Sequence, residues 1–411
     1  MKRIGLGQMI VLNAYWVGLS FMWNSLHPII LPAVLLNYVP DAQKNTYLGL
    51  LTFAGLLIAM VIQPVSGAIS DGWRSRWGRR RPLILLGTLF DFVFLAIMGW
   101  AGGFAWLVIG YVGLQLSSNI AHGPLQGLLP DRVPTGQLGV ASSLKTFMDM
   151  LALIIASLLA GRMLDPVSRD PSLIMGVVIG LLALAAAVTI LGTREDPTDG
   201  GNAPMRAGDL LSQFHVDFKG NRSYWWVIAE RGLFLLGIYG VQAFAQYYLQ
   251  DVLQVPDPPR QTGDLLATLT ISLVVLVLIG GWMVDKHGAK RVLYAGTLLA
   301  ALGMLLMMPA RSMMGLMASG AVLGAGIGLF LTANWALANK LAPSGEAGKF
   351  LGLTNLATAG SGALARLEGP ALDWLNALWP DRWAGYTSLF GFGAFCILLS
   401  ALLLIPVKES R

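Results

Sequence analysis

The chain has 411 residues, of which 55% are hydrophobic and only 12% are charged, and its formal net charge is +6. Soluble proteins carry about 25% charged residues, so this composition excludes an ordinary soluble fold. The apolar residues form stretches of about 20 residues, the length of α-helix that crosses a bilayer core. Short alternating strands, which would indicate a membrane β-barrel, do not dominate the sequence. We therefore predict an all-α membrane protein.

Twelve spans are predicted in chain order. They cover residues 10–36, 47–69, 83–102, 104–128, 138–164, 172–192, 223–250, 263–284, 291–309, 313–338, 347–371 and 385–406. The first apolar run continues through Trp16 and His27, which favours a span over a cleaved signal peptide. Lys and Arg concentrate in alternate connections, so we expect both termini in the cytoplasm. Topology, rather than binding of nucleic acid, then accounts for the net positive charge.

The longest polar stretch, residues 193–222, divides the chain into two halves and contains TREDPTDGGNAP, a composition typical of flexible linkers. Near its end, four apolar residues share one helical face: Leu210, Leu211, Phe214 and Phe218. They fit either a helix on the membrane surface or an ordinary linker helix. We predict an N-terminal six-helix bundle at 1–192, a cytoplasmic linker at 193–222 and a C-terminal bundle at 223–411.

The connection after the second span reads GAISDGWRSRWGRRRP, from Gly67 to Pro82. A degenerate copy, DKHGAKR, begins at Asp285 after the eighth span. The first loop resembles the signature loop of the major facilitator superfamily, in the form found in glycoside–pentoside–hexuronide:cation symporters such as melibiose and sucrose carriers. This resemblance implies twelve helices in two pseudo-symmetric bundles. It also implies secondary transport by alternating access, with no cofactor and no enzymatic activity.

The resemblance further implies that this loop is a cytoplasmic gating latch, which holds the outward-open state. The latch residues would be Gly67, Asp71, Gly78, Arg79, Arg80, Arg81 and Asp285. Glycines allow a tight turn and close helix approach. The arginines can pair with carboxylates or lipid phosphates. The alternative is that these charges only set the membrane topology.

Polar residues inside the spans predict a substrate cavity. We assign to it Asn24, His27, Asn119, His122, Gln126, Tyr239, Gln242, Gln246, Asn334 and Asn355. Amides, imidazoles and aromatic rings are suitable partners for sugar hydroxyls and ring faces. The same side chains could instead join neighbouring helices. In the tenth span, Gly320, Gly324 and Gly328 recur every four positions and predict close helix packing.

We assign a coupling or charge-balancing role to five of the charged residues within spans, where an unpaired charge costs about 2.5 kcal/mol or more. They are Lys145, Asp149, Glu230, Arg231 and Arg366. Lys145 and Asp149 are four residues apart and can neutralise each other. Glu230 and Arg231 are adjacent and point in different directions, so each needs a partner from another helix. Either Asp149 or Glu230 exchanges a proton, or these are permanent ion pairs.

These features predict a monomeric, proton-coupled carrier of a small polar solute, a sugar or glycoside, in the cell membrane. Two alternatives stay open: a lipid or amphiphile carrier or exporter on the same fold, and a non-transporting membrane assembly factor. The second span has no acidic residue before Asp71, which argues against the sodium site of melibiose-type carriers. The scattered histidines and single cysteine indicate no metal site, and neither a nucleophile elbow nor a P-loop is present.

Overall fold

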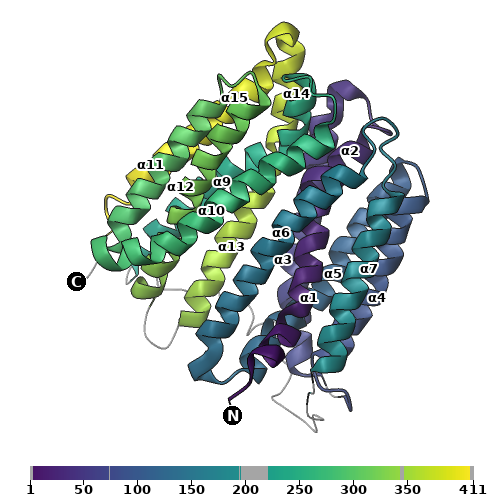
Figure 1. Cartoon of the computed structure of the whole chain (residues 1–411), viewed down its shortest axis with the longest axis vertical. Coiled ribbons are helices and arrows are strands. Elements are labelled where there is room, and N and C mark those ends of the chain that lie inside the picture. The colour runs from purple at the N-terminus through teal and green to yellow at the C-terminus, as the bar shows by residue number, and fades with distance from the viewer. Residues whose placement is uncertain (1–2, 74, 194, 196–220, 343–346, 408–411) are drawn as a thin grey trace. The chain divides into compact units, whose positions relative to one another are not determined.

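The computed structural model describes residues 3–73, 75–193, 195, 221–342 and 347–407, and in these ranges every regular element is a helix (Figure 1). The predicted helical face at 210–218 lies outside them. The long helices are α1 (Leu6–Ser25), α3 (Lys44–Asp71), α4 (Arg81–Trp100), α5 (Phe104–Arg132), α6 (Leu138–Met163), α7 (Ser172–Gly192), α9 (Arg222–Asp251), α10 (Pro258–His287), α11 (Ala289–Met307), α12 (Met313–Leu341), α13 (Ala347–Arg366) and α15 (Ala384–Leu403). The short elements are η1 (Leu26–Ile30), α2 (Leu31–Leu35), η2 (Asp41–Gln43), η3 (Thr135–Gln137), α14 (Glu368–Leu378) and η4 (Pro380–Arg382).

Within the described ranges, eleven helical segments are long and apolar enough to cross a bilayer. The eleventh predicted span, 347–371, corresponds to α13 and the start of α14. Some helices extend past their predicted ends, because hydropathy marks the membrane core and not the polar turns that flank it. For example, α10 begins at Pro258, a residue well suited to the first helical turn. Asp257 caps this helix by accepting a hydrogen bond of 3.1 Å from the Arg260 backbone nitrogen.

The first span is not a continuous α-helix. Its middle part, η1 (Leu26–Ile30), is a π-helical turn that contains Pro28, and α2 continues the span after it. Proline has no backbone N–H and therefore cannot complete the regular α-helical hydrogen-bond ladder. Pro28 thus coincides with a local change of helix type.

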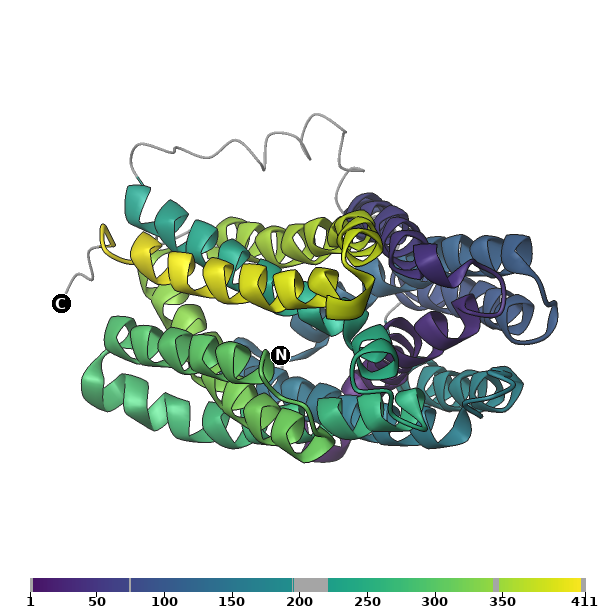
Figure 2. The ribbon, with the colours of Figure 1, turned by 90° about the horizontal axis from the view of Figure 1, so that it is seen from above.

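The helices pack into two units, one of Met1–Val39 and Ala54–Leu210, the other of Pro40–Phe53 and Leu211–Arg411. In unit 1, α1 packs against α6 and α7, and α4 packs against α5 and α7. In unit 2, α9 packs against α13 and α15, and α11 packs against α12 and α15 (Figure 2). Counted along each half of the chain, these are the same four pairs. The internal repeat inferred from the sequence therefore appears as a repeated pattern of helix neighbours.

The predicted glycine stripe of the tenth span lies at the contact between α12 and α10. A methyl group on Gly324 would meet the carbonyl oxygen of Leu269, and one on Gly328 would meet that of Leu273. Only hydrogen fits at these positions, so the two backbones approach closely there. Close approach increases van der Waals contact, which holds helices together where lipid removes the hydrophobic driving force.

Residues 40–53 belong to unit 2 by packing, although the predicted boundaries put them in the N-terminal bundle. The Nζ atom of Lys44 lies 2.6 Å from Asp251 Oδ1, and Asn45 donates a hydrogen bond of 2.8 Å to Asp373. Lys44 is only 2% exposed. A buried charge is tolerated only when it is well paired, so this ion pair explains how a lysine can lie inside the unit.

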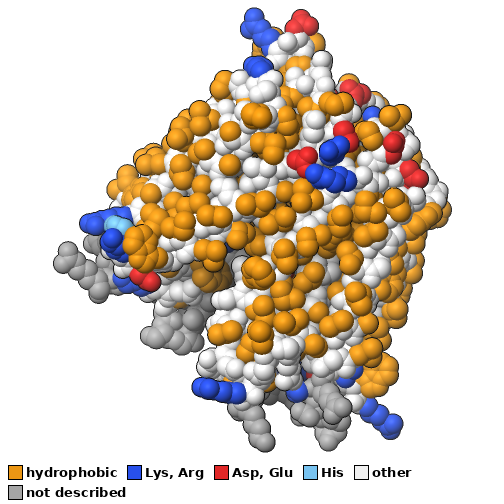
Figure 3. Space-filling view, viewed as in Figure 1, with side chains coloured by type: hydrophobic (Ala, Val, Ile, Leu, Met, Phe, Trp, Pro, Cys, Tyr) orange, Lys and Arg blue, Asp and Glu red, His pale blue; other side chains and the backbone are white. Residues whose placement is uncertain are grey.

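The helices present apolar side chains outwards. On the face shown in Figure 3, apolar side chains cover the lengths of the helices, and Lys, Arg, Asp and Glu lie mainly near helix ends. Leucines such as Leu278 and Leu191 are 76% and 77% exposed. Such exposure would promote aggregation of a soluble protein but suits contact with lipid.

Candidate functional site

The charged pair of unit 1 lies on α6 and faces α1. Lys145 Nζ is 2.8 Å from Asp149 Oδ2, and Ser20 Oγ of α1 donates a hydrogen bond of 2.8 Å to Asp149 Oδ1. Lys145 Nζ also lies 3.7 Å from the ring centroid of Trp16, a cation–π contact. The side chains of Lys145 and Asp149 are 27% and 19% exposed. The carboxylate is therefore compensated in charge and still accessible.

A chain of hydrogen-bonding groups in unit 1 begins at His27. Its Nε2 lies 3.0 Å from the Tyr111 hydroxyl, and Gln115 donates a hydrogen bond of 2.8 Å to the same hydroxyl. Asn119 in turn donates to the Gln115 backbone oxygen at 2.7 Å. The His27 ring stacks on Trp23, with centroids 4.9 Å apart. Polar groups beside an aromatic face are the lining expected for a hydroxyl-rich ligand.

His122 contacts the first of these groups through Trp16. Its ring meets Trp16 edge-on at a centroid distance of 5.0 Å, and it lies one turn beyond Asn119 on α5. Two other predicted cavity residues of unit 1 do not join the group through the contacts observed: Gln126 is exposed, and Asn24 donates to a backbone oxygen one turn earlier in its own helix. The group was recognised only in part, because Trp16, Tyr111 and Gln115 were not assigned to it.

In unit 2, a single amide joins the two adjacent charges. Asn334 of α12 donates a hydrogen bond of 2.8 Å to Glu230 Oε2 and accepts one of 2.8 Å from Arg231 Nη1. Arg231 Nε also donates to Thr358 Oγ1 of α13 at 2.9 Å. Glu230 and Asn334 are 0% exposed. Neighbouring helices thus supply partners for both charges, and the two bonds determine the orientation of the amide.

The remaining predicted site residues of unit 2 are more dispersed. Arg366 donates to the Tyr239 backbone oxygen at 3.0 Å, and Gln246 is buried. Gln242 is half-buried, whereas Asn355 is exposed. The polar residues predicted in these spans therefore range from buried to exposed.

The loop predicted to be a latch centres on Arg80. Its guanidinium lies 2.5 Å from Asp71 and 3.0 Å from Asp131, and Arg79 lies 2.7 Å from Asp131. The backbone nitrogen of Arg80 donates a hydrogen bond of 3.0 Å to Glu195. The hydrogen bond to Asp131 raises the pKa of Arg79, so this arginine keeps its charge at any physiological pH. A planar guanidinium can bind two carboxylates at once, which explains the position of Arg80.

Asp131 and Glu195 were missed in the sequence. Each follows a predicted span at its cytoplasmic end, on the same side as the basic loop. Acidic residues at these positions could have been recognised as partners for the arginines of that loop. Gly78 has a φ of +89°, and a side chain on it would collide with Glu195. Both the backbone conformation and the lack of space therefore require glycine at this position. The corresponding loop of unit 2 contains Gly288 at φ +86°, and Asp285 there is exposed.

The remaining predicted latch residues occupy the same region of unit 1. Gly67 of α3 lies against Gly123 of α5, where an added Cβ would be 3.6 Å from the Gly123 oxygen. Arg81 is half-buried at the first position of α4. The loop is therefore bonded to α3 through Asp71, to α5 through Asp131 and to the segment after α7 through Glu195.

A family model described as Major Facilitator Superfamily matches residues 5–366 and 232–411. The chain belongs to the major facilitator superfamily. This agrees with the resemblance of the Gly67–Pro82 loop. The protein is therefore a multi-pass member of a superfamily of non-enzymatic membrane carriers.

Curated relatives support the predicted branch of the superfamily. Solute carrier family 45 member 3 of Homo sapiens is 27% identical over 224 residues, which is 48% of this chain and 40% of that protein. Sucrose transport protein SUT1 of Oryza sativa subsp. japonica is 26% identical over 163 residues, covering 34% of this chain and 30% of that protein. These matches span less than half the length of either relative.

Solved structures show the fold. A D-xylose-proton symporter aligns with a TM-score of 0.74 at 14% identity, covering 97% of this chain and 98% of that one. The nucleoside transporter NupG aligns with a TM-score of 0.73 at 13% identity, covering 98% and 100%. The predicted all-α major facilitator fold is confirmed, and at these identities the likeness concerns the fold alone.

Proposed function

We propose that this carrier is a proton-coupled symporter of a sugar or glycoside. The observation that carries the proposal is the group of unit 1 in which aromatic faces and hydrogen-bonding side chains lie beside an accessible ion pair. Trp23 and Trp16 offer ring faces, His27 and His122 offer imidazoles, and Asp149 offers a carboxylate. The names of the sucrose transport relatives favour the same class of solute.

Asp149 is the better candidate for the proton site. It is 19% exposed and held by the side chains of Lys145 and Ser20, so a proton can reach it while Lys145 stays in contact with Trp16. Protonation would release Lys145 from its ion pair and change the charge that faces the solute. Glu230, by contrast, is 0% exposed and bonded to Asn334. We assign Glu230 and Arg231 to a permanent structural pair.

The latch loop supports the proposed topology. Arginines concentrate around Arg80, and positive charge is enriched on the cytoplasmic side of membrane proteins. We therefore propose a monomer in the cell membrane with both termini in the cytoplasm. The bonds of Arg80 with Asp71 and Asp131 would then act during the transport cycle on the cytoplasmic side.

The test begins with the solute. Thermal-shift screening of the purified protein against sugars, organic acids and lipids identifies ligands, and uptake of the best one is then measured in proteoliposomes with and without a pH gradient. We expect stabilisation by a sugar or glycoside and accumulation only when the outside is acidic. Stabilisation by lipids alone would overturn the sugar assignment.

The proton site is tested by Asp149→Asn. This variant should lose accumulation driven by the pH gradient while still exchanging labelled for unlabelled solute, because the site for the solute persists. Asp165→Asn is the matched control, since Asp165 lies in an exposed connection and accepts hydrogen bonds from backbone nitrogens there. Undiminished uphill uptake by Asp149→Asn would exclude Asp149 as the proton site.

A further inference from the structure

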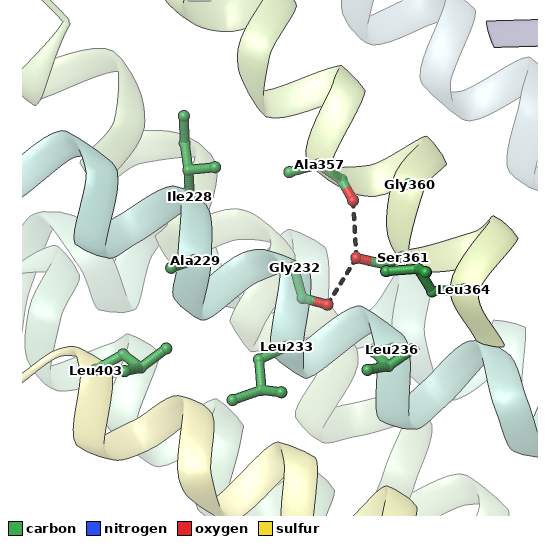
Figure 4. Close-up of a pocket in the computed structure, with 10 residues that line it drawn as sticks. All are labelled: Ile228, Ala229, Gly232, Leu233, Leu236, Ala357, Gly360, Ser361, Leu364 and Leu403. Carbon is green, nitrogen blue, oxygen red and sulfur yellow. Dashed lines mark hydrogen bonds between the residues drawn. The ribbon is translucent and has the colours of Figure 1, made fainter. Parts of the chain in front are cut away.

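Unit 2 contains a groove of about 500 Å³ between α9, α13 and α15 (Figure 4). Its length follows α9 from Ile228 to Leu236, and Leu364 of α13 and Leu403 of α15 complete its sides. The volume is in the range of small-molecule sites, roughly 300–1,000 Å³. None of the residues assigned to the solute site lines this groove.

The groove exists because two of its lining residues lack side chains. A Cβ atom added to Gly360 would meet no atom within 4 Å, and one added to Gly232 would meet only Ser361 Oγ at 3.5 Å. Neighbouring helices are not packed into this space. The space beside these glycines can therefore hold a ligand. It differs from the contact of α12 with α10, where glycines allow two backbones to touch.

The chemistry of the lining is almost purely hydrocarbon. Ser361 is its one side chain with a polar group, and the Ser361 hydroxyl lies 2.7 Å from the Gly232 carbonyl oxygen and 2.8 Å from that of Ala357 (Figure 4). Its proton is thus used inside the protein. A sugar would lose its hydrogen bonds here, whereas a hydrocarbon chain would lose nothing.

The surroundings indicate which hydrocarbon is available. Helices α9 and α15 are both membrane spans, and Leu364 at the edge of the groove is 57% exposed. Because these helices are long and apolar enough to span a bilayer, acyl chains are the apolar molecules available to this groove. An acyl chain is long, flexible and apolar, and it fills such a groove without requiring a polar partner.

A cation lies in line with the groove. Arg222 is exposed at the beginning of α9, and it precedes Ala229 and Leu236 by seven and fourteen residues. Positions seven apart on an α-helix differ in direction by only about 20°, so these three residues share one face. Trp225 and Trp226 follow Arg222, and tryptophans are enriched at the level of lipid head groups.

We propose that this groove binds one acyl chain of an anionic phospholipid, whose head group lies at Arg222. The bound chain fills the gap beside Gly232 and Gly360. It thereby supports the packing of α9 on α13, the same contact in which Arg231 bonds to Thr358. The lipid is a structural ligand of unit 2, separate from the transported solute.

The experiment uses the full-length protein, purified in detergent and mixed with phosphatidylglycerol or phosphatidylcholine, and counts bound lipids by native mass spectrometry. The wild type should retain one phosphatidylglycerol and bind it about fivefold more tightly than phosphatidylcholine, the preference that one arginine near the surface provides. Gly360→Leu should lose this lipid, because the new side chain occupies the groove. Gly176→Leu is the control, since Gly176 is an exposed glycine of α7 that also has nothing within 4 Å.

Arg222→Gln tests the head group independently, on an exposed helix end where folding is not at risk. It should keep one bound lipid and lose the preference for phosphatidylglycerol. Equal retention by wild type and Gly360→Leu, or an unchanged preference in Arg222→Gln, would overturn the proposal. So would a wild-type dimer that Gly360→Leu dissociates, because a second copy of the chain would then cover the groove.

Discussion

Replacing Asn334 by alanine tests the structure most directly, because this amide is the link between two buried charges. The change removes the hydrogen bond that Asn334 donates to Glu230 and the one that it accepts from Arg231. Arg231 keeps its bond to Thr358, but Glu230 retains no hydrogen bond from the residues that the structure describes. The carboxyl group is then fully buried without a hydrogen-bond donor from those residues.

Two estimates give a lower and an upper limit for the loss of unfolding free energy in Asn334→Ala. Hydrogen bonds to charged groups contribute about 1.5–3 kcal/mol each in soluble proteins, whereas polar contacts between membrane helices average about 0.6 kcal/mol. The lower value comes from contacts that can find new partners in the unfolded, membrane-bound state. Within the described part of the chain, no other hydrogen-bond donor reaches Glu230, so the desolvation of this carboxyl group adds to the loss. We expect Asn334→Ala to lower the free energy of unfolding by about 2–4 kcal/mol.

The assay is reversible unfolding by SDS in mixed micelles, followed by tryptophan fluorescence. Asn339→Ala is the matched control on the same helix, since Asn339 is exposed and, within the part of the chain that the structure describes, bonds only to the Trp335 carbonyl of its own helix. This control should stay within about 0.5 kcal/mol of the wild type. If the two variants lose equal stability, the amide bridge has no energetic importance and the argument for a structural Glu230–Arg231 pair fails.

Three further predictions concern the latch and the glycines. Arg80→Lys keeps the charge but not the planar fork, so transport in proteoliposomes should slow several-fold at unchanged expression. Gly78→Ala forces a side chain into a left-handed conformation and should lower the free energy of unfolding by about 1–3 kcal/mol, measured by the SDS assay; no loss would contradict the assigned turn. Gly324→Ala should cost about 1–3 kcal/mol by pushing α10 and α12 apart, whereas Gly281→Ala, with open space at its Cβ, should be neutral or stabilising.

Much of the fold could be predicted because lipid imposes strict requirements on sequence. A span must be apolar for about 20 residues, and that requirement located nearly all of the long helices. The Lys145–Asp149 pair followed from local geometry, since residues four apart on a helix are neighbours. The loop from Gly67 to Pro82 was recognisable because the glycines that its turn requires and the arginines that form its ion pairs lie within one short segment of the sequence.

Contacts between distant helices could not be predicted in the same way. Asn334 and Glu230 are 104 residues apart, and their meeting depends on the rotation of α12 relative to α9. Lys44 and Asp251 are separated by 207 residues, and nothing local marks either as half of a buried pair. A polar residue in a span indicates that a partner exists without identifying it.

The π-helical turn η1 has a consequence for how the first span tolerates change. A π turn holds about one residue more than an α turn, and one residue corresponds to about 100° of rotation around a helix axis. The five residues of α2, Leu31–Leu35, are all buried, so each is matched to neighbours on a particular side. Deleting a single residue within Leu26–Ile30 would therefore mainly rotate α2 about its axis, so that its side chains would face different neighbours. The shortening of the span would be a smaller effect.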